Sequence, residues 1–184
     1  LPLPVARFVQ RIGVDLPPFI EGIYKSLEKE LPKVIKYDSK DKQIEAIHRI
    51  IESNNMDDVA ILLPDNETVL KTYQALSKLG GNYEYRYNDK ENFRNNVDNL
   101  NFDSTNPKIM TYHSAKGLQF ETIFIPFIED FVEDGDSNQK ALYVAMTRTY
   151  RNLYVLFSGT LPSPLSKIEP SLYKTTDIET IDDM

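Results

Sequence analysis

The chain contains no cysteine, so neither a disulfide scaffold nor a thiolate metal site can form. It has only two histidines, His48 and His113, and a histidine-based metal centre is therefore not expected. No apolar run approaches the roughly 18 residues of a membrane span, and no cationic, apolar leader opens the sequence. These absences predict a soluble cytoplasmic protein with no metal site and no membrane partner. Since the first residue is Leu1 rather than Met, we expect a fragment of a longer protein.

The length and the charge of the chain narrow its class further. It has 184 residues, of which 41% are hydrophobic, enough for one domain with a sizeable core. Its net charge of −7 argues against a dedicated nucleic-acid binder, which usually has a basic surface. Residues 107–120 and 138–151 nevertheless contain bases and no acid, whereas residues 121–136 hold six acids and no base. Either these short windows differ by chance, or both basic segments face phosphate.

Apolar periodicity and capping residues predict strands that alternate with helices. Strands are expected at residues 33–37, 58–64, 83–87, 109–112, 122–127 and 153–157. Helices are expected within 1–11, from a cap at 39 or 41 through 51, and at 67–79, 93–100 and 138–150, with a short helix or turn at 23–31. This order predicts an α/β fold with a mainly parallel sheet and helices on both faces. The domain should cover residues 1–160, and residues 161–184 should form a tail that is poorly ordered or docks on another domain.

The stretch from residue 108 to residue 127 organises the chain. Two short apolar runs flank a polar turn, a pattern typical of strand, functional turn and strand. In a parallel sheet, ligand-binding groups lie beyond the carboxyl ends of the strands, so we expect His113, Ser114 and Lys116 there. Gly117 would permit a backbone shape or a close approach that a Cβ would hinder.

Two segments of the chain resemble motifs of one helicase family. Residues 111–120 read Thr-Tyr-His-Ser-Ala-Lys-Gly-Leu-Gln-Phe and resemble motif V of the UvrD/Rep branch of superfamily 1. Residues 141–150 read Ala-Leu-Tyr-Val-Ala-Met-Thr-Arg-Thr-Tyr and resemble motif VI. The resemblance implies the second, C-terminal RecA-like domain of an ATP-dependent DNA helicase or translocase that serves in DNA repair. Its expected substrate is ATP with Mg²⁺, and its expected polymer is single-stranded or partly duplex DNA.

The same resemblance implies an N-terminal RecA-like domain as the partner of this one. The phosphate-cradling sequence Gly-x-x-x-x-Gly-Lys-Ser/Thr is absent from the chain, so the partner would supply it together with the Mg²⁺-holding acid. The large subdomain that many relatives insert before motif V is absent or reduced to a stub. A segment with a further phosphate-contacting arginine would lie just before Leu1. We therefore expect that the chain alone hydrolyses no ATP.

The resemblance also implies roles for individual residues. Arg148 matches an arginine finger on the γ-phosphate, since a guanidinium stays charged and grips phosphate with paired donors. Gln119 matches a contact to the nucleotide sugar, although the family usually has Glu there. Lys116 would either supply positive charge on the nucleotide side or hold the turn, and Gly117 would lie on the nucleotide side as well. Arg151 is expected to be solvent-exposed or a minor phosphate contact.

Thr111, His113 and Ser114 match positions that the family uses for single-stranded DNA and for coupling between sites. A histidine ring can hydrogen-bond phosphate or stack on a base. Local readings stay open for these residues: the hydroxyls of Thr111 and Ser114 could cap the turn, and His113 could stabilise it. Arg148 could instead form a surface salt bridge.

Two other functions compete with a DNA motor. The same fold could be a non-catalytic module that binds a protein partner, which the acidic loop at residues 129–136 and the net negative charge favour. An RNA-directed motor is a third reading, because tracking along a backbone reads sequence poorly and the choice of sugar is not visible here. An intact phosphate loop encoded upstream would favour a motor over a binding module.

Overall fold

The computed structural model describes residues 1–14, 30–89, 94–133 and 135–177. Its strands are β1 (Lys33–Tyr37), β2 (Val59–Leu63), β3 (Glu84–Asp89), β4 (Arg94–Asp98), β5 (Lys108–Thr111), β6 (Phe120–Ile125) and β7 (Thr149–Ser158). Its helices are α1 (Leu3–Gln10), α2 (Lys40–Ser53), α3 (Asn66–Lys78) and α4 (Gly135–Met146), with short 3₁₀ turns η2 (Ile128–Asp130), η3 (Leu165–Lys167) and η4 (Pro170–Leu172).

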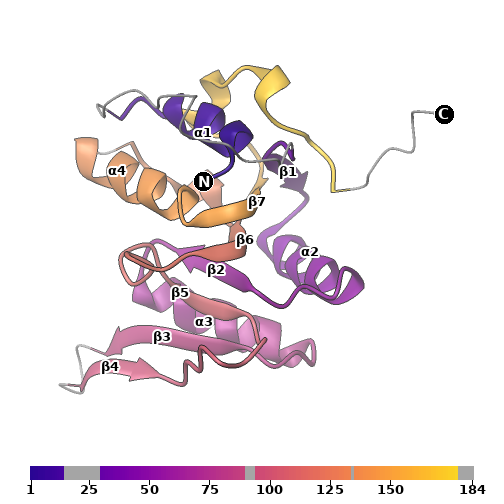
Figure 1. Ribbon diagram of the computed structural model, residues 1–184, viewed down its shortest axis with the longest axis vertical. Helices are drawn as coiled ribbons and strands as arrows, with labels where there is room; N and C mark the ends of the chain where they lie inside the picture. Colours follow the sequence, from indigo (N-terminus) through magenta and orange to yellow (C-terminus); the bar gives the residue numbers. More distant parts are fainter. Residues whose placement is uncertain (15–29, 90–93, 134, 178–184) are drawn as a thin grey trace.

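The strands form one seven-stranded sheet in the order β1-β7-β6-β2-β5-β3-β4 (Figure 1). All neighbouring pairs are parallel except β3 and β4, which pair antiparallel at one edge. The predicted α/β fold with a mainly parallel sheet is confirmed.

Polar side chains cap the first turns of two helices. Ser39 precedes α2, and its Oγ accepts a hydrogen bond from the Lys42 amide at 3.2 Å. Asp65 precedes α3, and its Oδ1 accepts from the Thr68 amide at 2.8 Å. Each side chain satisfies an amide of the first turn that has no partner inside the helix. These caps fix where the chain turns from strand to helix after β1 and β2.

The core has two parts, one on each face of the sheet. In β2, Ala60 and Leu62 pack with α1 and α4, whereas Val59, Ile61 and Leu63 pack with α2 and α3. All five side chains are buried, as expected for a parallel strand covered on both faces. The predicted helices on both faces are therefore confirmed.

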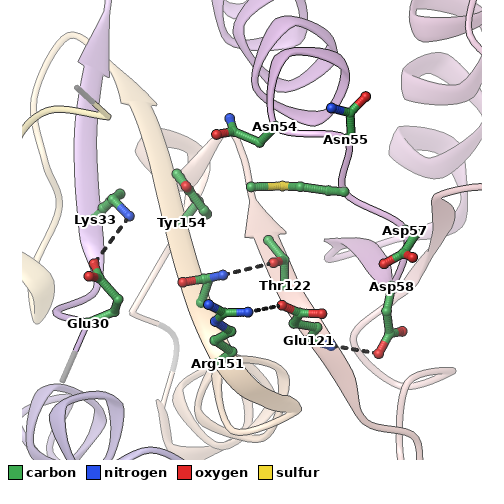
Figure 2. A pocket seen from close by; sticks show the side chains of 12 residues that line it. Glu30, Lys33, Asn54, Asn55, Asp57, Asp58, Glu121, Thr122, Arg151 and Tyr154 are labelled. Atoms are coloured by element: carbon green, nitrogen blue, oxygen red, sulfur yellow. Dashed lines mark hydrogen bonds and ion pairs between the residues drawn. The ribbon is translucent and has the colours of Figure 1, made fainter. Parts of the chain in front are cut away.

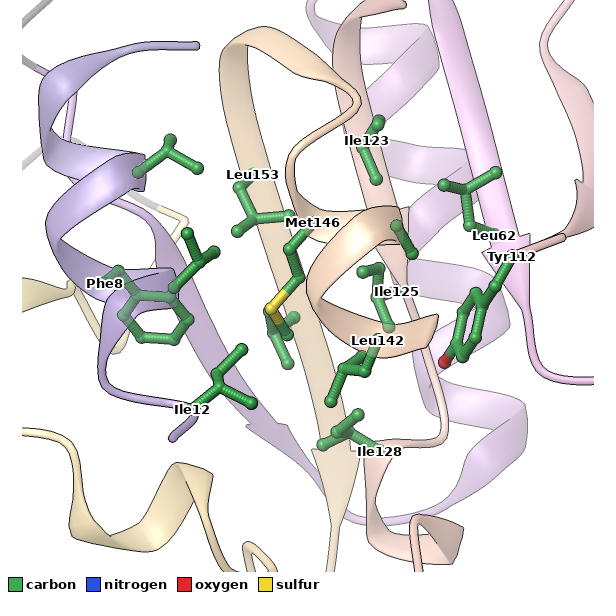
Figure 3. Packing of buried hydrophobic residues seen from close by; sticks show 14 of the residues in the cluster. Phe8, Ile12, Leu62, Tyr112, Ile123, Ile125, Ile128, Leu142, Met146 and Leu153 are labelled. Atoms are coloured by element: carbon green, nitrogen blue, oxygen red, sulfur yellow. The ribbon is translucent and has the colours of Figure 1, made fainter. Parts of the chain in front are cut away.

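Figure 3 shows the part of the core that α1 and α4 cover. Phe8 from α1 and Leu142 and Met146 from α4 gather over Leu153 of β7. Thr149, at the start of β7, is also fully buried. This packing holds the end of α4 against the starts of β6 and β7.

Two predicted elements differ from the structure. The segment expected to be helical at 93–100 contains strand β4, because this polar segment has little apolar surface with which to pack as a helix, and it pairs with β3 instead. The helix expected to reach Tyr150 ends at Met146, residues 147–148 form a turn, and Thr149 already belongs to β7. There, pairing of Phe120 with Thr149 extends the sheet and replaces the last helical turn.

Residues 161–177 pack on the domain, which differs from the expected poor packing of this segment. Leu165 and Ile168 are buried beside α1, and Tyr173 meets the ring of Phe8 edge-on at 5.9 Å. The Val34 amide donates to the Lys174 carbonyl at 2.8 Å, so the segment also joins the outer edge of β1. Docking of the tail on another domain stays a prediction. Residues 178–184, and most of the predicted connector and helix at 13–31, lie outside the described residues.

A buried carboxylate organises the loop between β4 and β5. Glu84 accepts hydrogen bonds from the Asn101 amide at 2.7 Å, from Asn106 Nδ2 at 3.3 Å and from the Ser104 hydroxyl. Lys108 Nζ lies 3.5 Å from Glu84 Oε2, and both side chains are 7% exposed. Burial alone raises the pKa of Glu84, but these donors outweigh it and hold the pKa below its usual value.

Glu84 should therefore make the domain sensitive to acid. A carboxyl whose folded pKa is depressed stabilises the fold above its unfolded pKa, near 4.5, and this stabilisation is lost as the pH falls through the lower folded value. Glu84→Gln should lower the free energy of unfolding by about 1–3 kcal/mol at pH 7. Below the unfolded pKa of Glu84, the stability of this variant should decline less steeply with pH than that of the wild type. Urea unfolding at several pH values measures both effects. Glu67→Gln, at an exposed site on α3, is the control, and equal acid sensitivity of the Glu84 variant and the wild type would contradict this role.

Candidate functional site

The turn between β5 and β6 crosses the sheet from one edge to the other. Both strands run parallel to β2, so the chain leaves β5 at the carboxyl edge and must enter β6 at the amino edge. His113 and Ser114 lie at the carboxyl edge, as expected, whereas Gln119 lies at the amino edge beside the start of β6. The predicted site residues therefore form two groups on opposite edges, connected by residues 112–119.

At the carboxyl edge, the hydroxyls of the turn bond to each other. Thr111 Oγ1 lies 3.0 Å from Ser114 Oγ and accepts a hydrogen bond from the Ser114 amide at 3.1 Å. Thr111 is buried, and the Ala115 amide donates to its carbonyl at 3.1 Å. This geometry favours the local-cap reading for both hydroxyls.

His113 is exposed, in contrast to its neighbours Tyr112 and Ala115, which are buried. Its carbonyl accepts from the Lys116 amide at 3.2 Å, so it is the backbone that stabilises the turn. The residue lines a hollow of about 330 Å³ together with Tyr112, Phe127 and Phe131. An imidazole beside an aromatic hollow is suited to contact with a flat, unstacked ring.

Lys116 and Gly117 lie within the crossing segment, and both are exposed. Gly117 has a φ of +86°, a conformation that favours glycine. A Cβ built at this position would meet no atom within 4 Å. Of the two reasons the sequence offered for this glycine, backbone shape applies and close approach does not.

At the amino edge, one backbone hydrogen bond joins the two motif segments. The Phe120 amide donates to the Arg148 carbonyl at 2.9 Å, so Gln119 and Arg148 lie on either side of the same link. Both residues reach this edge because they precede neighbouring parallel strands, β6 and β7. Gln119 is exposed.

The Arg148 side chain is half-buried and lies in the turn after α4. Its Nε donates to the Val144 carbonyl at 3.0 Å and its Nη2 to Thr147 Oγ1 at 3.3 Å, which caps the end of the helix. These contacts use two of the five N–H donors of the guanidinium. Within the described ranges, no carboxylate forms an ion pair with it. Arg151 differs, because its Nη1 pairs with Glu121 Oε1 at 2.7 Å.

Pattern reading missed two residues that shape the edges. At the carboxyl edge, fully buried Gln43 donates to Glu129 Oε1 at 2.9 Å and to Ser158 Oγ at 2.8 Å, and accepts from the Phe127 amide at 2.8 Å. These bonds hold Phe127 at a φ of 60°, unusual for a residue with a Cβ. The sequence signal that could have identified Gln43 is its place as a polar residue next to the buried apolar stripe of α2. At the amino edge the missed residue is Asp58.

The amino edge also carries a polar hollow of about 280 Å³. Figure 2 shows Lys33, Asp58, Glu121 and Arg151 around it, with a dashed line for the ion pair between Arg151 and Glu121. In the part of the chain that the structure describes, no group of three acidic or histidine side chains is arranged to hold a metal ion. None of the described helices is long and apolar enough to cross a bilayer.

Comparisons with known proteins agree with the motif assignment. Residues 108–156 match the family model of the UvrD-like helicase C-terminal domain. The "Putative ATP-dependent DNA helicase" of Acanthamoeba polyphaga mimivirus is 24% identical, and the match covers 72% of this chain and 23% of that protein. The RecBCD enzyme subunit RecB of Chlamydia pneumoniae is 35% identical over 38% of this chain and 6% of the subunit. The chain thus spans less than a quarter of either relative.

Solved structures give the same fold. The C-terminal domain of a possible DNA helicase from Lactobacillus plantarum WCFS1 superposes with a TM-score of 0.64 at 16% identity, covering 94% of this chain and 95% of that one. The Arterivirus nonstructural protein 10 helicase, solved with DNA, gives a TM-score of 0.52 at 9% identity, covering 79% of this chain and 35% of that one.

The sheet and its structural neighbours show that the chain has a RecA-like fold. Residues 108–156 are similar to the UvrD-like helicase C-terminal domain, which confirms the resemblance predicted from motifs V and VI.

Proposed function

We propose that this chain is the second motor domain of an ATP-dependent DNA helicase or translocase. Its amino edge faces ATP across a gap from an N-terminal RecA-like domain, and its carboxyl edge contacts single-stranded DNA. Closure of the two domains on ATP and their opening after hydrolysis move the protein along the strand. The chain by itself hydrolyses no ATP.

The main support for this proposal is the environment of the Arg148 guanidinium. Its guanidinium is anchored to the end of α4 through two donors, and no described carboxylate neutralises it. A half-buried cation that keeps unused donors at the edge of a domain is suited to an anion brought by another domain. Arg148 would stabilise the negative charge that develops on the transferred phosphoryl group.

The remaining amino-edge groups suit the sugar end of the same nucleotide. Gln119 is exposed next to the Phe120–Arg148 link, and its amide can both donate to and accept from a ribose hydroxyl. Lys116 would add positive charge on the same side. The phosphate loop and the Mg²⁺ ligands would come from the N-terminal domain, because this sequence has no phosphate-loop motif.

The carboxyl edge suits nucleic acid through His113 rather than through the hydroxyls. Thr111 and Ser114 already bond to each other, so their proposed contact with DNA would follow only if the turn rearranged. The His113 ring lies at the surface beside aromatic residues. Residues 112–119 connect this edge to Gln119. A shift of Gln119 on nucleotide binding would therefore move the His113 turn and alter its contact with DNA.

Mutations at the two edges should affect different ligands. In the protein that carries this chain together with its N-terminal domain, Gln119→Ala should raise the KM for ATP about 3- to 10-fold, the loss of one or two hydrogen bonds, with the DNA Kd unchanged. His113→Ala should weaken single-stranded DNA binding by a similar factor and leave the KM for ATP without DNA unchanged. Steady-state kinetics and fluorescence anisotropy measure these quantities.

Lys78→Ala, near the end of α3 and outside the predicted site residues, is the control for surface charge. If both variants changed ATP and DNA parameters equally, the assignment of one ligand to each edge would be wrong. If neither changed any parameter, the non-catalytic binding module would be the better reading.

A further inference from the structure

We infer that Asp58 is a positioning residue, which sets the placement of Arg148 relative to Gln119 by clasping the starts of β6 and β7. The inference rests on the proposed function, because it takes these two residues as the nucleotide contacts. Asp58 itself touches neither of them and directly precedes β2.

One carboxylate oxygen of Asp58 makes both connections. Asp58 Oδ2 accepts a hydrogen bond from the Glu121 amide at 3.0 Å, two residues after Gln119. The same oxygen accepts from the Tyr150 hydroxyl at 2.5 Å, two residues after Arg148. Figure 2 shows the first of these bonds, with Asp58 pointing to the backbone of β6.

The main chain and Thr149 complete the clasp. The Asp58 carbonyl accepts from the Thr122 amide at 3.0 Å, which fixes the position of the aspartate against β6. Thr149 Oγ1, fully buried, donates to the Glu121 carbonyl at 2.8 Å. The short segments that follow Gln119 and Arg148 are thus joined by side chains on both sides of their backbone link.

The hydrogen bonds of this clasp, formed by Asp58, Glu121, Thr149 and Tyr150, are suited to keep the starts of β6 and β7 at a fixed spacing. The hydrogen bond to Asp58 is the main cause that raises the pKa of Tyr150 to about 12, so the phenol remains a donor even in mildly alkaline solution. A charged acceptor strengthens both bonds relative to a neutral one. Tyr150 is 44% exposed, so burial of its ring does not account for its position. A reacting group displaced by about 1 Å can cost on the order of 10²-fold in rate, so a clasp at this place affects catalysis.

The test uses Tyr150→Phe, which removes one hydroxyl, in the protein that carries the N-terminal domain. We expect the kcat of DNA-stimulated ATP hydrolysis to fall about tenfold, with the KM for ATP and the DNA Kd within twofold of wild type. Asp58→Ala should lower kcat at least as much, and Asp58→Asn should restore most of that loss because its amide oxygen can accept both bonds. The neighbouring, exposed Asp57 provides the control, and Asp57→Ala should keep the wild-type kcat.

The outcomes separate this inference from the function on which it rests. If Arg148→Ala leaves hydrolysis intact, the proposed function fails and the clasp has no catalytic role. If Arg148→Ala abolishes hydrolysis while Tyr150→Phe keeps the wild-type kcat, the clasp alone is refuted. A loss in Tyr150→Phe that follows a lower urea midpoint, or that raises the KM for ATP in proportion, would show a general structural effect and would also refute it.

Discussion

Arg148→Ala is expected to reduce DNA-stimulated ATP hydrolysis on the order of 10³-fold, while the Kd for single-stranded DNA stays within twofold of wild type. The experiment uses the protein that joins this chain to its N-terminal domain. The loss should be large because the guanidinium is the proposed source of positive charge on the transferred phosphoryl group. DNA binding should be spared because the His113 turn lies at the other edge of the sheet.

Two further variants make this result specific. Arg148→Lys keeps a cation but loses the forked donor geometry, so it should recover only part of the rate. Arg151 lies three residues after Arg148, and its guanidinium is paired with Glu121. Arg151→Ala removes the same charge as Arg148→Ala, but it should change kcat less than about threefold. Unfolding curves are needed for Arg148→Ala, since the variant also removes the two bonds that cap α4. Wild-type hydrolysis in a folded Arg148→Ala protein would remove this residue from the site.

Phe8→Ala should cost about 3–5 kcal/mol in the free energy of unfolding, a typical value for a buried aromatic residue. Phe8 of α1 is fully buried against the sheet (Figure 3). Its ring also meets Tyr173 of the C-terminal segment. Its removal therefore leaves a cavity where three parts of the chain meet. Urea unfolding followed by far-UV circular dichroism gives the value.

Phe102→Ala is the matched control, because it deletes the same side chain at a site that is 55% exposed. It should cost less than about 1 kcal/mol. Equal losses in the two variants would mean that α1 and residues 161–177 do not pack as one unit with the sheet. Separation of the unfolding curve of Phe8→Ala into two transitions would point to the same conclusion.

Local signals in the sequence predicted most of the fold. The cap Ser39, one of two residues predicted to begin α2, and the continuous apolar run of β2 depend on neighbouring residues alone, and the structure contains both. Strand β4 and the end of α4 were not, because both depend on pairing with strands that are distant in sequence. The packing of residues 161–177 was missed for a related reason, since their partners are α1 and β1.

The site was predicted as a set of residues but not as an arrangement. Motif spacing singled out His113, Gln119 and Arg148, yet only the parallel pairing of β5 and β6 with β2 separates the first from the other two. Asp58 and Gln43 carried no motif, and their roles come from backbone amides that fold next to them. Polar residues that serve distant main-chain groups leave no periodic pattern in a sequence.

The crossing segment between β5 and β6 is anchored at both ends by the register of β2, with Leu63 opposite Thr111 and Val59 opposite Thr122. Its length is consequently as constrained as its composition. An inserted or deleted residue would have to be accommodated between two fixed strands. It would displace His113 at the carboxyl edge, Gln119 at the amino edge, or both. We therefore expect this part of the chain to accept exchanges of surface side chains far more readily than insertions or deletions.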